Sequence, residues 1–126
     1  MLELYSSPTL SITQPPNKDF ICCTWNGPQT EQTIRTGGWH IIDVVKKHGI
    51  TKVLVDNTLV IGDWHQAADW VFNTWFPELM NQGVKRFARI RAGRLLPEAT
   101  ARRAVPDTHN IKSFNTPQEA IDWLSH

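Results

Sequence analysis

The chain has 126 residues, of which 40% are hydrophobic and 20% are charged. This balance is typical of an ordered globular protein and excludes an intrinsically disordered chain. The formal net charge is only +1, which excludes a strong global field for nucleic acids or anionic membranes. We therefore expect one domain over residues 1–126 and no nucleic-acid partner.

The N-terminus and the lengths of the apolar runs lead us to expect a soluble, cytoplasmic protein. Residues 1–5 lack a basic segment followed by an apolar block, and no apolar run reaches the roughly 18 residues of a membrane span. Cys22 and Cys23 are adjacent, so on a strand they would point to opposite faces and could not form an unstrained disulfide. We expect two buried thiols and no metal site, because the histidine spacings complete no usual pattern.

The first third of the chain predicts an extended segment and two strands. Residues 1–8 end in a Ser-Ser-Pro sequence and are predicted to be an extended lead-in. Residues 9–13 and 20–25 are predicted strands, separated by a turn with two prolines. Because this link is short, the two strands should be antiparallel neighbours.

A first helix should begin near Thr30, where apolar residues start to recur at helical spacing. Gly49 is its expected C-cap, after a basic last turn. Gly37 and Gly38 interrupt the helix, and each glycine costs about 1 kcal/mol in a helix interior. We therefore expect a bend or close packing at that point.

Residues 52–83 form a strand, a loop and a helix around which the rest of the chain is organised. The strand is predicted to end at Asp56, with a polar turn at Asn57 and Thr58, and Asp63 is the expected N-cap of the helix. One side of that helix is apolar, which favours core packing, with a tryptophan-lined ligand pocket as the alternative. That stripe consists of Trp64, Ala67, Ala68, Val71, Trp75, Phe76 and Leu79. A kink or second short helix is expected from Pro77, ending at Gly83.

The next predicted strand, residues 87–92, alternates in an unusual way. Arg89 and Arg91 fall on one face, and Ala88 and Ile90 fall on the other. A strand covered on both faces would be continuously apolar, so we expect one sheet face to be partly wet here. A third helix should open at Leu96 and end by Pro106.

The chain should close with a strand at residues 110–114 and a helix. Thr116 is the expected cap of that helix, Pro117 takes its first position, and Glu119 can return a hydrogen bond to the backbone of Thr116. The predicted order is β-β-α-β-α-β-α-β-α. This describes an α/β protein with a mostly parallel five-stranded sheet, an N-terminal antiparallel strand and four main helices.

At this point the sequence resembles a known family. The element order, the strand at residues 52–56, the Trp75-Phe76-Pro77 corner and the closing helix at residues 119–124 resemble bacterial STAS domains. These are the SpoIIAA-like anti-sigma-factor antagonists, with a lipid-transfer-like branch grouped beside them. The resemblance extends over nearly the whole chain and implies a SpoIIAA-like sheet of βα units.

The resemblance also implies a difference in regulation. STAS antagonists carry a phosphorylatable serine just after an aspartate where the second helix begins, and Asp63 matches that aspartate. Trp64 and His65 follow it here, and neither has a hydroxyl group. The usual serine switch is therefore not expected, while the loop at the carboxyl end of the strand is still a place where ligands and partners of open α/β sheets bind.

Two groups of polar residues are candidates for a chemical or anion-binding role. Asp56, Asp63 and His65 cluster around one loop, but no nucleophile motif, metal pair or phosphate-binding glycine loop accompanies them. We therefore expect no enzyme activity and no cofactor. Arg91 and Arg94 flank the end of their strand, and their planar guanidinium groups suit an anion such as a phosphate or carboxylate.

The sequence favours a non-enzymatic regulatory or binding domain that contacts a protein partner through residues 57–65. The alternative is a carrier of a small apolar or anionic, lipid-like ligand, which a real cavity behind the tryptophan stripe would favour. Self-association as a homodimer is also kept open. The candidate partner- or ligand-binding residues are Asp56, Asn57, Thr58, Val60, Asp63, Trp64, His65, Arg91 and Arg94.

Overall fold

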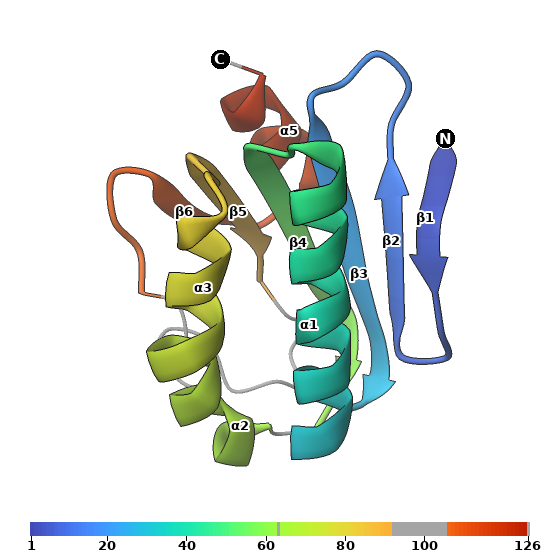
Figure 1. The fold of residues 1–126 in the computed structure, drawn as a ribbon, viewed down its shortest axis with the longest axis vertical. Helices are drawn as coiled ribbons and strands as arrows, with labels where there is room; N and C mark the ends of the chain where they lie inside the picture. Colours follow the sequence, from blue (N-terminus) through green and yellow to red (C-terminus); the bar gives the residue numbers. More distant parts are fainter. Residues whose placement is uncertain (63, 92–105, 126) are drawn as a thin grey trace.

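The computed structural model describes residues 1–62, 64–91 and 106–125. In this part of the chain a six-stranded sheet is covered by helices on both faces (Figure 1). The strands are β1 (Leu2–Ser6), β2 (Leu10–Gln14), β3 (Phe20–Pro28), β4 (Lys52–Ile61), β5 (Arg86–Ile90) and β6 (Ile111–Phe114). The helical segments are α1 (Glu31–His48), α2 (His65–Trp70), η1 (Val71–Trp75), α3 (Phe76–Asn81) and α5 (Pro117–Leu124).

The strands lie side by side in the order of the chain. β1, β2 and β3 pair antiparallel, and β3, β4, β5 and β6 pair parallel. The parallel arrangement of the last four strands and the antiparallel link before them are confirmed. The five-strand prediction is wrong, because residues expected to be a lead-in form the edge strand β1. A register shift between Glu3 and Tyr5 interrupts the two-residue alternation of β1. A search of the sequence for alternating residues therefore does not detect this strand.

The caps of α1 confirm its predicted ends. The Thr30 hydroxyl accepts from the Thr33 N–H at 3.1 Å, and the Thr33 hydroxyl accepts from the Thr30 N–H at 2.9 Å. Gly49 takes the left-handed conformation, with φ of 62°, and closes the helix. The helix runs unbroken through Gly37 and Gly38, so close packing rather than a helix break accounts for this pair.

The second helical run changes its geometry in the middle. α2 continues into the π-helical turn η1, where the Phe76 N–H bonds to the Val71 carbonyl five residues back. Pro77 follows at the start of α3 and has no N–H to donate to the preceding turn. The predicted second short helix from Pro77 is thus observed, and the chain leaves it at Gly83 with φ of 99°.

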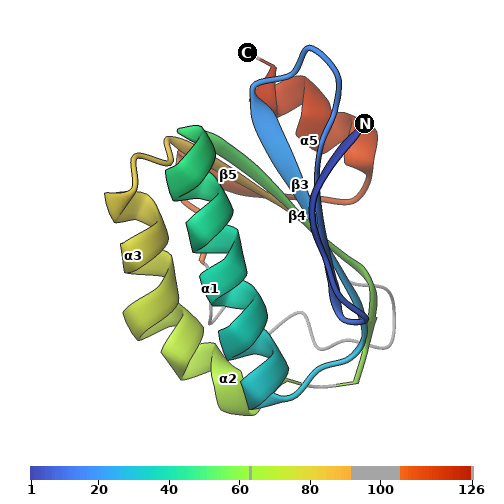
Figure 2. The same ribbon diagram turned by 45° about the vertical axis from the view of Figure 1, so that its right-hand side comes forward.

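Each face of the sheet has its own layer of helix. α1 and the α2–η1–α3 run lie on one face, and α5 lies on the other (Figure 2). The α5 side buries a small cluster of Phe20, Leu54, Ala88, Ile90, Ala120 and Leu124. The opposite side holds the larger cluster, which includes Ile12, Cys23, Trp25, Ile41, Val45, Val53, Val55, Val71, Trp75, Leu79 and Phe87.

β5 is covered on both faces, which corrects the prediction of a wet face. Arg89 is only 3% exposed, and the other residues from Phe87 to Ile90 are buried as well. Arginine can stay charged in such a place when its donors are bonded. Nη2 of Arg89 donates to the Ser113 hydroxyl at 2.6 Å and lies 3.9 Å from a carboxylate oxygen of Asp107.

The C-terminal helix begins as predicted. The Thr116 hydroxyl accepts from the Glu119 N–H at 3.3 Å. The Glu119 carboxylate accepts a hydrogen bond from the Thr116 hydroxyl at 3.0 Å. The predicted bond was instead to the backbone N–H of Thr116. Four helices were predicted, whereas the described residues contain three helical runs. The expected helix from Leu96 lies outside those residues.

Candidate functional site

The site is organised by an irregularity in β4. Asn57 and Thr58 were predicted to form a turn after a strand ending at Asp56, and this prediction is wrong because β4 continues to Ile61. The turn chemistry is nevertheless present. A carboxylate oxygen of Asp56 accepts from the Thr58 N–H at 2.9 Å and from its hydroxyl at 2.7 Å, as aspartates do in tight turns.

These bonds hold a β-bulge. Along β3, Thr24 pairs with Asp56 and Asn26 pairs with Leu59. β4 therefore has one residue more than β3 between the two pairs, which is the definition of a bulge. Bulges change which side chains face each side of a sheet, because strand side chains alternate with a period of two.

The bulge decides which residues after it face the helices. Val55 and Asn57 point to the α1 face, and Val60, three residues further, also points there. Val60 is 6% exposed, whereas Leu59 and Ile61 are each 54% exposed. Without the extra residue, simple alternation would turn Val60 outward and its two neighbours inward.

A cavity of about 70 Å³ lies between this half of β4, α1 and the α2–η1 run. A buried water needs roughly 10–15 Å³, and an engineered cavity of about 150 Å³ binds benzene. Aromatic and branched side chains make up most of the wall of the cavity beside β4, with three polar side chains among them. The lining residues are Trp25, Gln29, Ile34, Gly38, Val55, Asn57, Val60, Trp64, Trp70, Val71, Trp75, Phe87 and Arg89.

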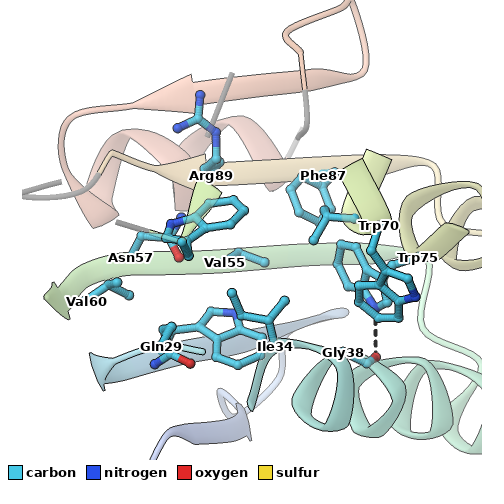
Figure 3. Close-up of a pocket in the computed structure, with 13 residues that line it drawn as sticks. Gln29, Ile34, Gly38, Val55, Asn57, Val60, Trp70, Trp75, Phe87 and Arg89 are labelled. Carbon is cyan, nitrogen blue, oxygen red and sulfur yellow. Dashed lines mark hydrogen bonds between the residues drawn. The ribbon is translucent and has the colours of Figure 1, made fainter. Parts of the chain in front are cut away.

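The π turn places two tryptophans against one glycine. Trp70 and Trp75 are five residues apart, a spacing that brings side chains together in a π turn but not in an α-helix. A Cβ on Gly38 would lie 2.9 Å from the Trp75 ring and 3.3 Å from the Trp70 ring. Nε1 of Trp75 donates to the Gly38 carbonyl at 2.7 Å (Figure 3).

Trp70 is also held from its outer side by α1. The Arg35 guanidinium carbon lies 5.3 Å from the Trp70 ring centroid. Trp39 meets the same ring edge-to-face, with the centroids 5.6 Å apart. Such contacts are each worth on the order of 1 kcal/mol. They fix the position of Trp70 in the wall of the cavity.

Asn57 is the buried polar residue of the cavity wall. It is 8% exposed, and its side chain lines the cavity. Gln29, a second polar residue of the wall, is held by the backbone, because its Nε2 donates to the Asn26 and Gly27 carbonyls at 3.1 and 3.4 Å. Asn57, Val60 and Arg89 lie toward one end of the cavity, and Trp70, Trp75 and Gly38 lie toward the other (Figure 3).

The structure brings together part of the predicted site. Asn57, Val60 and Trp64 line the cavity, and Asp56 and Thr58 form the bulge beside it. Val60 was a candidate partner- or ligand-binding residue, and the structure buries it in the wall of the cavity. The prediction that Asp63 is the N-cap of the second helix is wrong, because Trp64 is the N-cap residue of α2, and it makes no side-chain capping bond.

The remaining predicted residues do not join this group. His65 is exposed at the first position of α2. Nη1 of Arg91 donates to the Asn115 side chain at 2.7 Å, and Arg91 does not line the cavity. Asp63 and Arg94 lie outside the described residues.

Sequence reasoning missed several lining residues. Trp70 was absent from the predicted stripe because a spacing of five is invisible to a search for 3.6-residue periodicity. Trp25 was assigned only to a strand end, and Arg89 to a solvated face. Gly38 carried the clearest signal, since a glycine inside a helix needs a packing reason.

The two cysteines lie on opposite faces of β3, as adjacent strand residues should. Cys23 is fully buried and belongs to the cluster under α1, whereas Cys22 is half-buried against the α5 cluster. Burial, and then the negative charge of Asp56, raise the pKa of Cys22 to about 11. Burial likewise raises the pKa of Cys23. Both groups stay thiols at neutral pH, which makes them poor nucleophiles.

The described residues form no group of three or more histidine, cysteine or acidic side chains that could hold a metal ion. No helix in the described part of the chain is long and apolar enough to span a membrane.

No family model matches the chain, and no curated protein sequence matches it. The anti-sigma factor antagonist SpoIIAA, solved in its unphosphorylated form, is similar with a TM-score of 0.62 and 14% identity. The match covers 93% of this chain and 98% of that one.

A second solved structure is an uncharacterised protein of the DUF3478 family with a SpoIIAA-like fold, from Shewanella loihica PV-4. It matches with a TM-score of 0.60 and 21% identity, over 95% of this chain and 98% of that one. At these identities the likeness concerns the fold. The parallel βα units from β3 to β6, with helices on both faces, are therefore a SpoIIAA-like, STAS-type fold.

Proposed function

We propose that this domain binds a small, largely apolar ligand in the cavity between β4, α1 and the α2–η1 run. The observation that carries the proposal is the cavity behind the tryptophan stripe. Aromatic walls with a few convergent polar groups are typical of small-molecule sites. A simple core would be filled, since protein interiors pack about as densely as organic crystals.

The described lining residues support binding rather than catalysis. They include no histidine, cysteine, serine, threonine or carboxylate, so none of these residues could act as a general base or nucleophile. The thiol of Cys23 is buried elsewhere in the same layer, and its raised pKa keeps it protonated. A role as carrier or ligand sensor fits these residues.

Native mass spectrometry of the protein purified from its own host tests the proposal. The expected spectrum contains a second species, heavier by one small molecule, which disappears when the protein is unfolded and refolded in clean buffer. The refolded protein should then bind the fluorescent probe 1-anilinonaphthalene-8-sulfonate while keeping its folded circular-dichroism spectrum. A single unliganded mass, together with no probe binding, would contradict the proposal.

A protein partner is the second candidate. Leu59 and Ile61 are each 54% exposed on the outward side of β4, and exposed aliphatic pairs at a strand end suit a contact surface. This contact would use the residues that flank Val60, not Val60 itself. Sedimentation velocity of the parent and of a Leu59→Lys/Ile61→Lys variant tests self-association. Equal monomer fractions over the whole concentration range would rule out a dimer at this surface.

A further inference from the structure

The described cavity wall has one charged side chain, and its charge is engaged elsewhere. Nη2 of Arg89 donates to the Ser113 hydroxyl at 2.6 Å and lies 3.9 Å from a carboxylate oxygen of Asp107. The Arg89 guanidinium points away from Asn57 (Figure 3). The described lining residues therefore offer a ligand no counter-charge. An ion that entered this apolar space would lose its water without gaining an opposite charge, which is strongly unfavourable.

The other polar groups of the described wall are two neutral amides, those of Gln29 and Asn57. The Gln29 amide is bonded to the protein through both of its polar atoms. Its Nε2 donates to two backbone carbonyls, and its Oε1 accepts from the Thr33 hydroxyl at 2.9 Å. Asn57 is 8% exposed and lines one end of the cavity. Because an amide both donates and accepts, Asn57 is complementary to a neutral group that does the same, such as a hydroxyl or an amide.

The apolar part of the wall limits the body of the ligand. Trp25, Trp70, Trp75 and Phe87 contribute aromatic rings to the wall, and another ring packs well against such surfaces. The volume of about 70 Å³ is roughly half that of the engineered cavity that binds benzene. The body of the ligand is therefore no larger than one ring, part of which extends into the mouth, and a long acyl chain does not fit.

We propose that the ligand is a small neutral molecule, no larger than one substituted ring, whose hydroxyl or amide group bonds to the side chain of Asn57. This inference rests on the proposed function and adds the chemical class of the ligand. Any charged group on a bound molecule has to stay outside the cavity. Asn57 is the specificity residue, and Arg89 contributes to the wall without binding the polar group of the ligand.

Benzamide and benzoate test the neutral class in the parent protein, because they have nearly the same shape and differ in charge. Binding is followed by the indole N–H signals of the lining tryptophans in 15N-edited NMR spectra. Trp123 packs against the cluster on the α5 side, so its signal is the internal control. Benzamide should bind at least about 10-fold more tightly than benzoate, because burying an unpaired charge costs far more than burying a bonded amide. Equal affinities, or tighter binding of benzoate, would overturn the neutral class.

Phenol and toluene form a second pair, which differs by a hydroxyl in place of a methyl group and tests the contact with Asn57. Asn57→Leu should lower the affinity for phenol relative to toluene by about 10-fold or more, because the buried hydroxyl is left without its partner. Gln29→Leu is the matched control, because the Gln29 amide is already bonded to the protein, and it should leave this ratio as in the parent. An unchanged ratio in Asn57→Leu, or an equal change in both variants, would overturn the assignment of Asn57.

The outcomes also distinguish this inference from the proposed function. A charged or long-chain molecule retained in the native mass spectrum would keep the ligand-binding function and refute the neutral class. If none of the four probes changes the signals of the lining tryptophans, the class is refuted as well, and the retained-ligand spectrum alone decides the proposed function. The comparison of benzamide with benzoate needs no variant, so it stands even if a substitution prevents folding.

Discussion

The two faces of the sheet are covered in different ways. Toward α5, Leu54, Ala88 and Ile90 follow the regular alternation of their strands and meet Ala120 and Leu124 in a small aliphatic cluster. Toward α1, the same strands meet tryptophans, a glycine pair and a buried amide around a cavity.

The difference lies in three departures from regular geometry, all on the α1 side. β4 has a bulge at Asn57 and Thr58, the second helical run has a π turn, and α1 has glycines where it meets Trp25 and Trp75. Each departure costs stability by itself. Because all three occur around one cavity, we infer that this part of the molecule has a function. The α5 side is packed without such departures. We therefore expect substitutions on that side to change stability by the amounts usual for their type.

The largest effect should come from a charge on the inward side of the bulge. Val60→Glu buries a carboxylate in the apolar wall and should lower the free energy of unfolding by about 3 kcal/mol or more. Leu59→Glu is the matched control, because its side chain is exposed, and it should change stability by less than about 0.5 kcal/mol. Urea unfolding midpoints measure both. Equal losses at the two positions would mean that the bulge does not orient these side chains.

An intermediate effect is expected at the contact between α1 and the tryptophans. Gly38→Ala brings a Cβ within 2.9 Å of the Trp75 ring, and overpacking costs about 1–3 kcal/mol. The gain of about 1 kcal/mol in helix propensity offsets part of this, so a net loss of about 1–2 kcal/mol is expected in urea unfolding. Thr36→Ala, at an exposed position of the same helix, should be neutral or slightly stabilising. A stabilised Gly38→Ala protein would mean that the rings of Trp70 and Trp75 shift at little cost to make room for the added Cβ.

On the α5 side a conventional capping loss is expected. Thr116→Ala removes the acceptor of the Glu119 N–H and should cost about 1 kcal/mol. The urea midpoint should fall with an unchanged slope. Gln118→Ala, in the exposed first turn, should change it by less than about 0.5 kcal/mol. An unaltered midpoint in Thr116→Ala would show that the cap contributes nothing. Because Thr116 lies on the other side of the sheet, probe binding in the cavity should be the same in Thr116→Ala as in the parent.

Much of the fold could be predicted because it depends on local chemistry. Thr30, Gly49 and Thr116 mark helix ends by hydrogen bonds and backbone conformations that only a few residue types provide. The alternation of strands with helices after residue 20 correctly predicts parallel pairing. β1 was missed because a bulge breaks its alternation over only five residues.

The site was harder to predict because it depends on departures from the periods that the patterns assume. Asn57 and Thr58 have the composition of a turn, and a bulge uses the same chemistry inside a strand. Once the bulge is misread as a turn, Val60 is assigned to the wrong side. Trp70 is lost in the same way, since a π turn shifts it out of the helical stripe.

The smallest effect should come from the hydrogen bonds that hold the bulge. Asp56→Ala removes the acceptor of the Thr58 N–H and hydroxyl, and because these groups are exposed to water the loss should be about 0.5 kcal/mol. The substitution has a second, independent readout. Burial first, and the Asp56 charge second, raise the pKa of Cys22 to about 11. Removing the charge lowers that pKa, so at pH 9 more of Cys22 is thiolate and iodoacetamide should alkylate it faster.

Thr58→Val is the matched control, because it removes one of the bulge bonds and leaves the Asp56 charge in place. Its stability should fall by no more than that of Asp56→Ala, and its Cys22 alkylation rate should equal that of the parent. Mass spectrometry of the alkylated peptide separates Cys22 from the fully buried Cys23. Faster alkylation in both variants would mean that loosening of the bulge, and not the charge, exposes Cys22. An unchanged rate in Asp56→Ala would remove Asp56 as a cause of the raised pKa and leave burial alone.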